Sequence, residues 1–213
     1  MSLILDSIRK HKIIAIVRNI KPGDILAVSK ALYNGGIRLM EVTFNQSSAT
    51  GEQDTDQSIR IINEYFGDKV DIGAGTVMTV KQVETAIKAG AKYIISPNTN
   101  LDVMKKTIGM GAISIPGAFT PSEITTAYEN GAGFVKIFPA MALGTAYIKA
   151  IRSPINHIPL LAVGGVNDKN LKDYMACGIS GVGIGSSLVS KRLIEEGKFE
   201  ELTYLAKRYT SQL

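Results

Sequence analysis

The sequence contains only one cysteine and two histidines among its 213 residues. A single cysteine excludes an internal disulfide framework and agrees with a reducing compartment. We expect Cys177 to pack on a helix with its neighbours Tyr174 and Met175. The histidines, His11 and His157, have no carboxylate or cysteine at metal-ligand spacing, so we expect surface or loop positions for them and no metal site.

Long apolar runs are also missing. No stretch approaches the roughly 20 continuous apolar residues of a membrane helix, and residues 1–6 lack the basic region and cleavage site of a signal peptide. We therefore expect a cytoplasmic protein with no membrane partner. The 24 basic residues outnumber the 19 acidic ones, but they are scattered along expected helices. This scatter argues against nucleic-acid binding, whereas the mild positive balance would help attract an anionic small molecule.

Short β-branched runs alternate with segments of helical pattern along the whole chain. Turns that contain glycine precede several runs, and helix-start signals occur at 22–24, 120–123 and 167–168. Alternating β and α elements with apolar residues on both strand faces predict a parallel sheet, and eight such units predict its closure into a barrel. The eight runs are 13–18, 39–44, 71–77, 93–97, 113–117, 134–139, 159–163 and 181–185.

The expected architecture is therefore an α/β protein with one (β/α)₈ TIM-barrel domain over residues 1–213. A doubly wound open sheet is the alternative, but residues 18–21 (RNIK) after the first run are not the glycine-rich turn typical of that fold. Leu3, Ile4, Leu5 and Ile8 predict an extra N-terminal helix that packs over the bottom of the barrel. No linker or low-complexity stretch divides the chain.

Lys136 lies inside the apolar run 134–139 (FVKIFP). Burial in apolar surroundings disfavours the charged ammonium and lowers its pKa. A neutral lysine amine can attack a ketone and form a Schiff base, so this run is a candidate for covalent carbonyl chemistry. The alternative is a lysine at the end of an edge strand that extends its ammonium into water.

Polar residues fall where the mouth of a barrel would be. The active site of a (β/α)₈ barrel is built at the C-terminal ends of its strands. Arg18 ends the first run, Glu41 and Thr43 lie in the second, and Thr76 lies in the third. By alternation, Glu41 can face the barrel interior together with Lys136. The pair is either a structural ion pair or a nucleophile with its acid/base partner, and the Thr76 hydroxyl could instead bond to backbone.

Two turns that contain glycine follow the last two runs, at 163–167 (VGGVN) and 183–187 (GIGSS). In this fold a phosphate is often held at these positions by backbone N–H groups and a helix N-terminus. Each turn alone is as easily a tight loop. Together, after the seventh and eighth strands, they favour a phosphate site.

These motifs resemble the KDPG/KHG aldolase family, the class I lyases that act on 2-keto-3-deoxy-6-phosphogluconate (KDPG) and 4-hydroxy-2-oxoglutarate (KHG). The similarity covers nearly the whole chain. Its most specific stretches are 35–44 (GGIRLMEVTF), 73–77 (GAGTV), 96–97 (SP), 115–117 (IPG) and 135–140 (VKIFPA).

The resemblance implies an aldehyde-lyase that releases pyruvate and an aldehyde, either glyceraldehyde 3-phosphate or glyoxylate, from a small and usually phosphorylated keto acid. It implies a homotrimer and requires no metal or cofactor. Lys136 would form the Schiff base, and Glu41 would transfer protons. Arg18 and Thr76 would bind the substrate carboxylate, and Pro97 and Phe138 would form part of the pocket wall. The phosphate would be bound by Gly164, Gly165, Gly185 and Ser186.

The sequence also departs from the family pattern. Asn45 stands where some members carry arginine, and Val163 stands where many carry threonine. Arg18 could supply the missing charge, and the expected long loop 45–57 could carry a different substrate preference. Two other functions fit the residues: a phosphate-binding barrel isomerase or synthase without a Schiff base, and a non-catalytic sugar-phosphate binding module.

Overall fold

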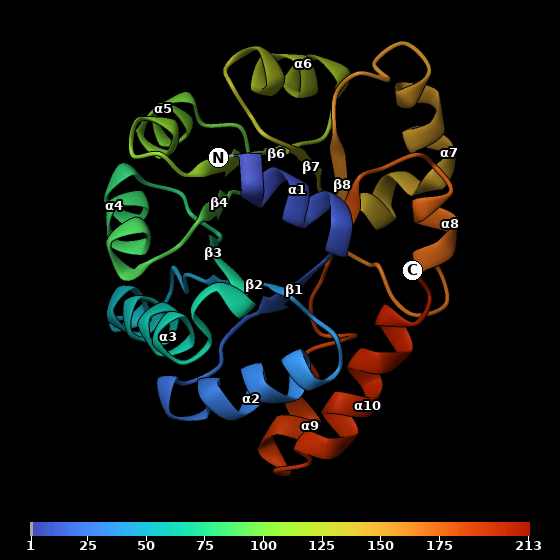
Figure 1. Cartoon of the computed structure of the whole chain (residues 1–213). Coiled ribbons are helices and arrows are strands. Elements are labelled where there is room, and N and C mark those ends of the chain that lie inside the picture. The colour runs from blue at the N-terminus through green and yellow to red at the C-terminus, as the bar shows by residue number, and fades with distance from the viewer. Residues whose placement is uncertain (1) are drawn as a thin grey trace.

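The strands form one parallel barrel at the centre of the molecule, as the computed structural model of residues 2–213 shows (Figure 1). All eight predicted runs contain strands, most of them shorter than predicted by one or two residues at an end. The strand order is β5-β4-β3-β2-β1-β9-β8-β7-β6, and every pairing is parallel. The strands are β1 Ile13–Val17, β2 Leu39–Thr43, β3 Asp71–Gly75, β4 Tyr93–Ile95, β5 Ile113–Ile115, β6 Gly117–Ala118, β7 Val135–Ile137, β8 Leu160–Val163 and β9 Gly181–Ile184.

Pro116 divides the fifth predicted run into β5 and β6, which accounts for the ninth strand label. A proline has no N–H to donate to a neighbouring strand, so the regular ladder is interrupted there. Its carbonyl still accepts a hydrogen bond from the Lys136 N–H at 2.9 Å. Because β5 pairs with β4 and β6 pairs with β7, this one run joins the two ends of the sheet and nearly closes the barrel.

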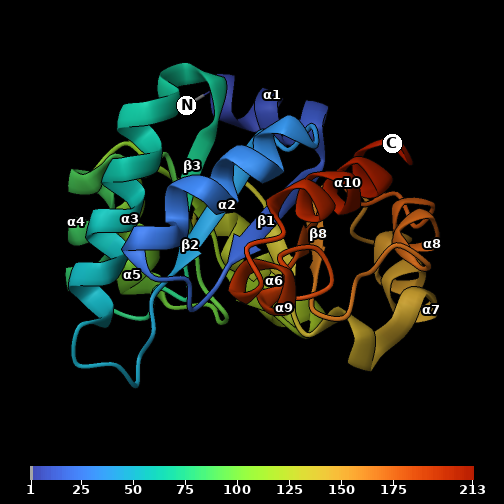
Figure 2. The ribbon, with the colours of Figure 1, turned by 90° about the horizontal axis from the view of Figure 1, so that it is seen from below.

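Helices surround the barrel on its outside (Figures 1 and 2). Helix α6 starts as predicted, with a capping box between Thr120 and Glu123. One prediction was wrong: residues 51–57 of the expected long loop belong to α3. The helix-start signal at 167–168 lies just before α8, which begins at Leu171. The helices are α1 Ser2–His11, α2 Pro22–Asn34, α3 Gly51–Phe66, α4 Val80–Ala89, α5 Leu101–Gly109, α6 Pro121–Glu129, α7 Ala140–Arg152, α8 Leu171–Met175, α9 Lys191–Glu195 and α10 Phe199–Thr210, with a short 3₁₀ turn η1 at Gly67–Lys69.

Alternation along the strands produces two separate cores. Residues of one parity, such as Val135 and Ile137, pack outward against the helices. Residues of the other parity fill the barrel interior, where Phe134 and Leu161 lie. The Tyr93 ring occupies space left by Gly73, and its hydroxyl donates a hydrogen bond of 2.7 Å to the Met40 carbonyl. The lower interior is therefore filled by side chains, and a ligand can enter only from the opposite end.

Helix α1 covers the N-terminal end of the barrel, as predicted (Figure 2). Ile8 is fully buried, a burial that contributes about 1.5 to 3 kcal/mol. Ile4 and Leu5 pack against the same interior cluster. Leu3 does not, because its side chain is 81% exposed.

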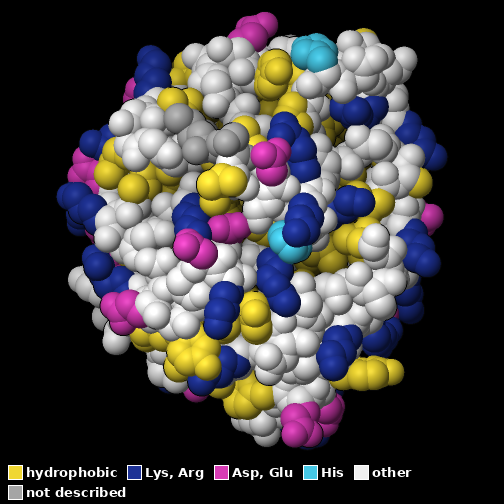
Figure 3. Space-filling view, in the orientation of Figure 1, with side chains coloured by type: hydrophobic (Ala, Val, Ile, Leu, Met, Phe, Trp, Pro, Cys, Tyr) yellow, Lys and Arg dark blue, Asp and Glu magenta, His cyan; other side chains and the backbone are white. Residues whose placement is uncertain are grey.

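The surface at the α1 end mixes basic, acidic and apolar side chains, with no single block of one charge (Figure 3). Cys177 is buried just beyond the end of α8 rather than on it. Among the residues that the structure describes, no helix has both the length and the apolar character needed to cross a membrane.

Candidate active site

Lys136 lies in the middle of β7, between β6 and β8, and is paired with Gly117 and Leu161. Strand β7 is therefore not an edge strand. The Lys136 side chain belongs to the inward-facing parity and is only 4% exposed. Its Nζ lies 4.6 Å from the centre of the Phe138 ring. The alternative of an ammonium extended into water is wrong for this residue.

The surroundings of Lys136 favour its neutral amine. Burial lowers the pKa of Lys136, the Glu41 charge raises it, and the Arg18 charge lowers it further, with burial as the largest cause. Burial also raises the pKa of Glu41, against the opposing effects of Lys136 and Arg18. Both shifts have the same consequence: the site favours a neutral amine beside a protonated carboxyl group over two buried charges.

Glu41 lies on the inward face of β2, where it is 2% exposed and aligned with Ile16 of β1 and Gly73 of β3. Its carboxyl group rests against Gly75. A Cβ at residue 75 would overlap that carboxyl group, and it would lie 3.0 Å from Thr43 Cγ2. The glycine in the predicted 73–77 motif therefore leaves space for the carboxyl group of the predicted proton carrier.

A cavity of about 490 Å³ opens at the C-terminal end of the barrel. Among residues 2–213, the side chains that line it include three basic ones, Arg18, Lys136 and Lys191, and no aspartate or glutamate. A cavity with this charge balance suits an anionic ligand. Seven predicted site residues line it: Arg18, Lys136, Phe138, Gly164, Gly165, Gly185 and Ser186.

Three predicted site residues are not among those that line this cavity. Glu41 faces the barrel interior from β2, and Thr76 is linked to the cavity by the hydrogen bond that it accepts from Arg18. Pro97 lies against β6, where a Cβ at Gly117 would overlap its carbonyl group. The structure thus places Pro97 against β6 rather than in the cavity wall.

The two predicted glycine turns meet at one side of the cavity. Gly164 and Gly165 both have positive φ, 93° and 84°, a conformation that side-chain-bearing residues adopt rarely. A Cβ at Gly165 would also overlap the Met141 side chain. The Ser187 hydroxyl donates a 2.8 Å hydrogen bond to the Val166 carbonyl and so links the turns.

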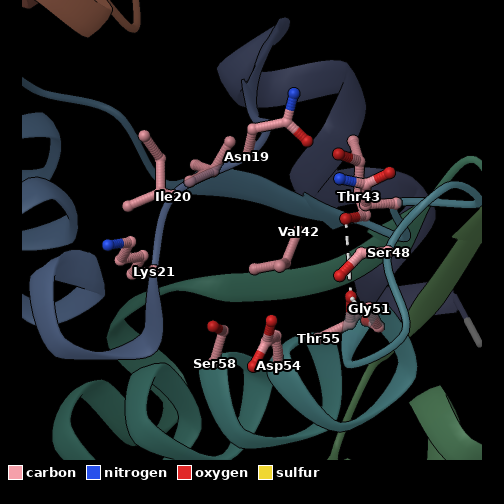
Figure 4. Close-up of a pocket in the computed structure, with 12 residues that line it drawn as sticks. Asn19, Ile20, Lys21, Val42, Thr43, Ser48, Gly51, Asp54, Thr55 and Ser58 are labelled. Atoms are coloured by element: carbon pink, nitrogen blue, oxygen red, sulfur yellow. Dashed lines mark hydrogen bonds between the residues drawn. The ribbon is translucent and has the colours of Figure 1, made fainter.

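Asn45, the departure noted in the sequence, does not face the barrel cavity. It lines a second cavity of about 180 Å³ outside the barrel. Figure 4 shows two other residues of this cavity, Val42 of β2 and Ser58 of α3. The Asn45 Oδ1 accepts a hydrogen bond from the Ser47 N–H at 3.0 Å. Arg18, in contrast, lines the barrel cavity.

The sequence reasoning missed two polar residues of the cavity, Asn19 and Lys191. Asn19 follows Arg18 in a left-handed conformation, with φ of 56°, which no spacing rule would find. Lys191 was detectable, because a cation shortly after the predicted phosphate turn at 183–187 is a natural phosphate partner. Within residues 2–213, no group of three or more His, Cys, Asp or Glu side chains is arranged to hold a metal ion.

Comparison with known proteins agrees with this geometry. A family model described as "KDPG and KHG aldolase" matches residues 4–205. The 2-dehydro-3-deoxy-6-phosphogalactonate aldolase of Escherichia coli K12 is 35% identical over 201 residues, which cover 94% of this chain and 95% of that protein. The fold and the sequence together define an aldolase-type barrel, and the chain belongs to the KDPG and KHG aldolase family.

Two solved structures extend the comparison. KDPG aldolase from Legionella pneumophila, with pyruvate captured as a covalent carbinolamine, is 27% identical, has a TM-score of 0.85, and covers 95% of this chain and 96% of that one. A protein cage designed by fusing symmetric oligomeric domains is 34% identical, with a TM-score of 0.81, over 95% of this chain and 74% of that one.

Proposed function

We propose that this protein is a class I aldolase that cleaves a phosphorylated 2-keto-3-deoxy sugar acid into pyruvate and an aldehyde. The observation that carries the proposal is Lys136, a buried lysine whose lowered pKa favours its neutral amine in the wall of an open cavity. The carbinolamine in the Legionella pneumophila relative supports the same covalent chemistry.

In the first stage, the lone pair of Lys136 Nζ attacks the C2 ketone, and the carbonyl electron pair moves to oxygen, which takes up a proton as the nitrogen loses one. The product is a carbinolamine. Burial raises the pKa of Glu41, which makes its carboxyl group more able to hold and pass on a proton. Glu41 gives that proton to the departing hydroxyl, which leaves as water, and the nitrogen lone pair forms the iminium.

In the second stage, the Glu41 carboxylate takes the proton of the C4 hydroxyl. The C3–C4 bond then breaks, its electron pair moves toward the iminium, and C4 leaves as an aldehyde. The resulting enamine takes up a proton at C3, and water releases pyruvate from Lys136. Nitrogen serves as the electron sink throughout, so the same lysine is needed for both bond cleavage and product release.

The charge of the cavity supports a substrate with two anionic ends. Arg18 and Thr76 would receive the carboxylate near Lys136. Gly164, Gly165, Gly185 and Ser186 would receive the phosphate through backbone N–H groups and a hydroxyl, and Lys191 would add a counter-charge at that end. Phe138 packs beside the amine, whereas Pro97 would act only indirectly, through the backbone of β6.

The test measures pyruvate release from KDPG, from its galactonate epimer KDPGal and from KHG. Turnover of a phosphorylated substrate is expected in the wild type and should be lost in Lys136→Arg, because a guanidinium stays protonated and cannot attack a carbonyl. Undiminished turnover in Lys136→Arg would rule out the Schiff-base mechanism. The three rates also rank the substrates, which share the same reacting carbons.

We further propose a homotrimer in the cytoplasm. Support for an oligomer comes from the similar chain of the designed cage, whose building blocks are symmetric oligomeric domains. Sedimentation equilibrium should give three times the chain mass, and a single-chain mass at micromolar concentration would contradict the trimer. The cytoplasmic location stays a prediction from the sequence.

A further inference from the structure

Thr76 holds a backbone conformation that a β-branched residue rarely adopts. Its φ is 56°, in the left-handed region, directly after the last residue of β3. Such outliers persist only where neighbouring groups hold them, and they gather at functional sites. The Thr76 hydroxyl accepts a hydrogen bond of 3.3 Å from the Arg18 guanidinium, which lines the cavity of Lys136.

Two side-chain amides, neither of which lines the cavity of Lys136, connect in sequence to the backbone of Thr76. Gln82 Nε2 donates to Gln46 Oε1 at 2.9 Å, and Gln46 Nε2 donates to the Thr76 carbonyl at 2.7 Å. The direction of both bonds is fixed by a backbone group, because the Met78 N–H donates to Gln82 Oε1 at 2.8 Å. That bond leaves only the nitrogen of Gln82 to face Gln46, and only the nitrogen of Gln46 to face Thr76.

We propose that Gln46 is a positioning residue whose amide holds Thr76 in its left-handed conformation, and thereby sets the Thr76 hydroxyl and Arg18 to receive the substrate carboxylate. The inference rests on the proposed aldolase function, and it assigns a task to a loop residue that does not line the cavity of Lys136.

The hydrogen-bond donors that Thr76 and Arg18 leave free suit a carboxylate. The Thr76 hydroxyl oxygen already accepts from Arg18, so its own proton is free to be donated elsewhere. Arg18 uses one N–H on Thr76 and keeps its other donors. A carboxylate accepts hydrogen bonds on both oxygens, and charge-assisted bonds to arginine are among the strongest available. If Thr76 relaxed to an ordinary φ, its hydroxyl would turn away and Arg18 would lose its partner.

The test traps the imine of pyruvate on Lys136 with borohydride and measures the pyruvate concentration that gives half-maximal trapping. Gln46→Leu should raise this concentration about threefold to tenfold, the equivalent of about one hydrogen bond, with the same maximal trapping. Gln53→Leu, an exposed glutamine in the first turn of α3, is the matched control and should leave it unchanged.

Acetone separates positioning from general disturbance, because it forms an imine but has no carboxylate. Gln46→Leu should leave acetone trapping unchanged, and equal losses toward acetone and pyruvate would overturn the proposal. Unchanged half-saturation by pyruvate in Gln46→Leu would overturn it as well. Failure of the wild type to trap pyruvate would instead remove the proposed aldolase function.

The hydrogen bonds from Gln82 to Gln46 and from Gln46 to Thr76 lead to a second prediction. Because Gln82 acts through Gln46, the Gln46→Leu/Gln82→Leu double variant should need no more pyruvate than Gln46→Leu alone. If the two single-variant increases in half-saturating pyruvate concentration multiplied in the double variant, Gln46 and Gln82 would act independently, and the proposed path from Gln82 through Gln46 to Thr76 would be contradicted.

Discussion

Replacing Gly75 with alanine would disturb Glu41, the proposed proton carrier, without changing any group that is proposed to react. Gly75 lies in β3, outside the left-handed region, so its backbone tolerates a side chain. The added Cβ would lie 2.7 Å from Glu41 Cδ and 3.0 Å from Thr43 Cγ2, where ordinary contact begins at 3.4 Å. The Glu41 carboxyl group must therefore move by about 1 Å.

A displacement of that size has a calculable consequence. Misplacing a catalytic group by about 1 Å can cost about 10²-fold in rate, and overpacking a filled interior costs about 1 to 3 kcal/mol of stability. Gly75→Ala should therefore lower kcat for pyruvate release by about 10²-fold and lower the thermal midpoint by several degrees, while borohydride still traps pyruvate on Lys136. A continuous assay of released pyruvate and a thermal melt measure both effects.

Gly109 provides the matched control. It ends α5, and a Cβ there would meet no atom within 4 Å. Gly109→Ala should leave kcat unchanged and should slightly raise stability, because alanine loses less backbone entropy than glycine on folding. If Gly75→Ala kept full kcat and an unchanged melting temperature, the packing of Glu41 on Gly75 would have no role in the reaction.

Three further predictions follow from the charges of the site. Arg18 lowers the pKa of Lys136 and Glu41 raises it. Only the neutral amine attacks pyruvate, so the rate of borohydride trapping should fall as the pH drops below the pKa of Lys136. The pH at which this rate is half-maximal should be higher in Arg18→Ala and lower in Glu41→Gln. Shifts of both variants in the same direction would contradict this. Lys136→Met should abolish turnover and raise the thermal midpoint by about 2 to 4 °C, since burying a polar amine costs free energy that a methionine side chain does not cost, whereas a lower midpoint would show that the lysine is a net stabilising contact. Lys191→Ala should raise KM for a phosphorylated substrate about threefold to tenfold without changing half-saturation by pyruvate. Arg192→Ala, which removes the arginine of an exposed pair with Glu196 outside the cavity of Lys136, should change neither value, and equal effects of the two variants would remove Lys191 from the phosphate site.

The barrel was predictable because its signal is local and repeated. Each strand–helix unit carries its own apolar run and its own turn, so an error in one unit does not change the overall topology. The errors lie where tertiary contacts decide the outcome. Gly51 begins α3 inside a polar segment that reads as a loop, and Leu3 is exposed although its neighbours in α1 pack inward.

The candidate site was predictable where alternation decides which way a side chain faces. Lys136 and Glu41 face inward because of their strand parity, and the sequence contains that parity. Contacts between the loops at the C-terminal end of the barrel were not predictable from strand alternation. The bond from Gln46 to Thr76 joins two loops 30 residues apart and depends on a left-handed backbone, which neither composition nor spacing reveals.

The measurement that bears most directly on Lys136 is mass spectrometry of the protein after borohydride reduction in the presence of pyruvate. The expected result is one added reduced-pyruvate group per chain, located on the peptide that contains Lys136 and absent from Lys136→Arg. If the wild type released pyruvate from its substrate while Lys136 stayed unmodified, or if the adduct lay on another lysine, Lys136 would not be the Schiff-base residue.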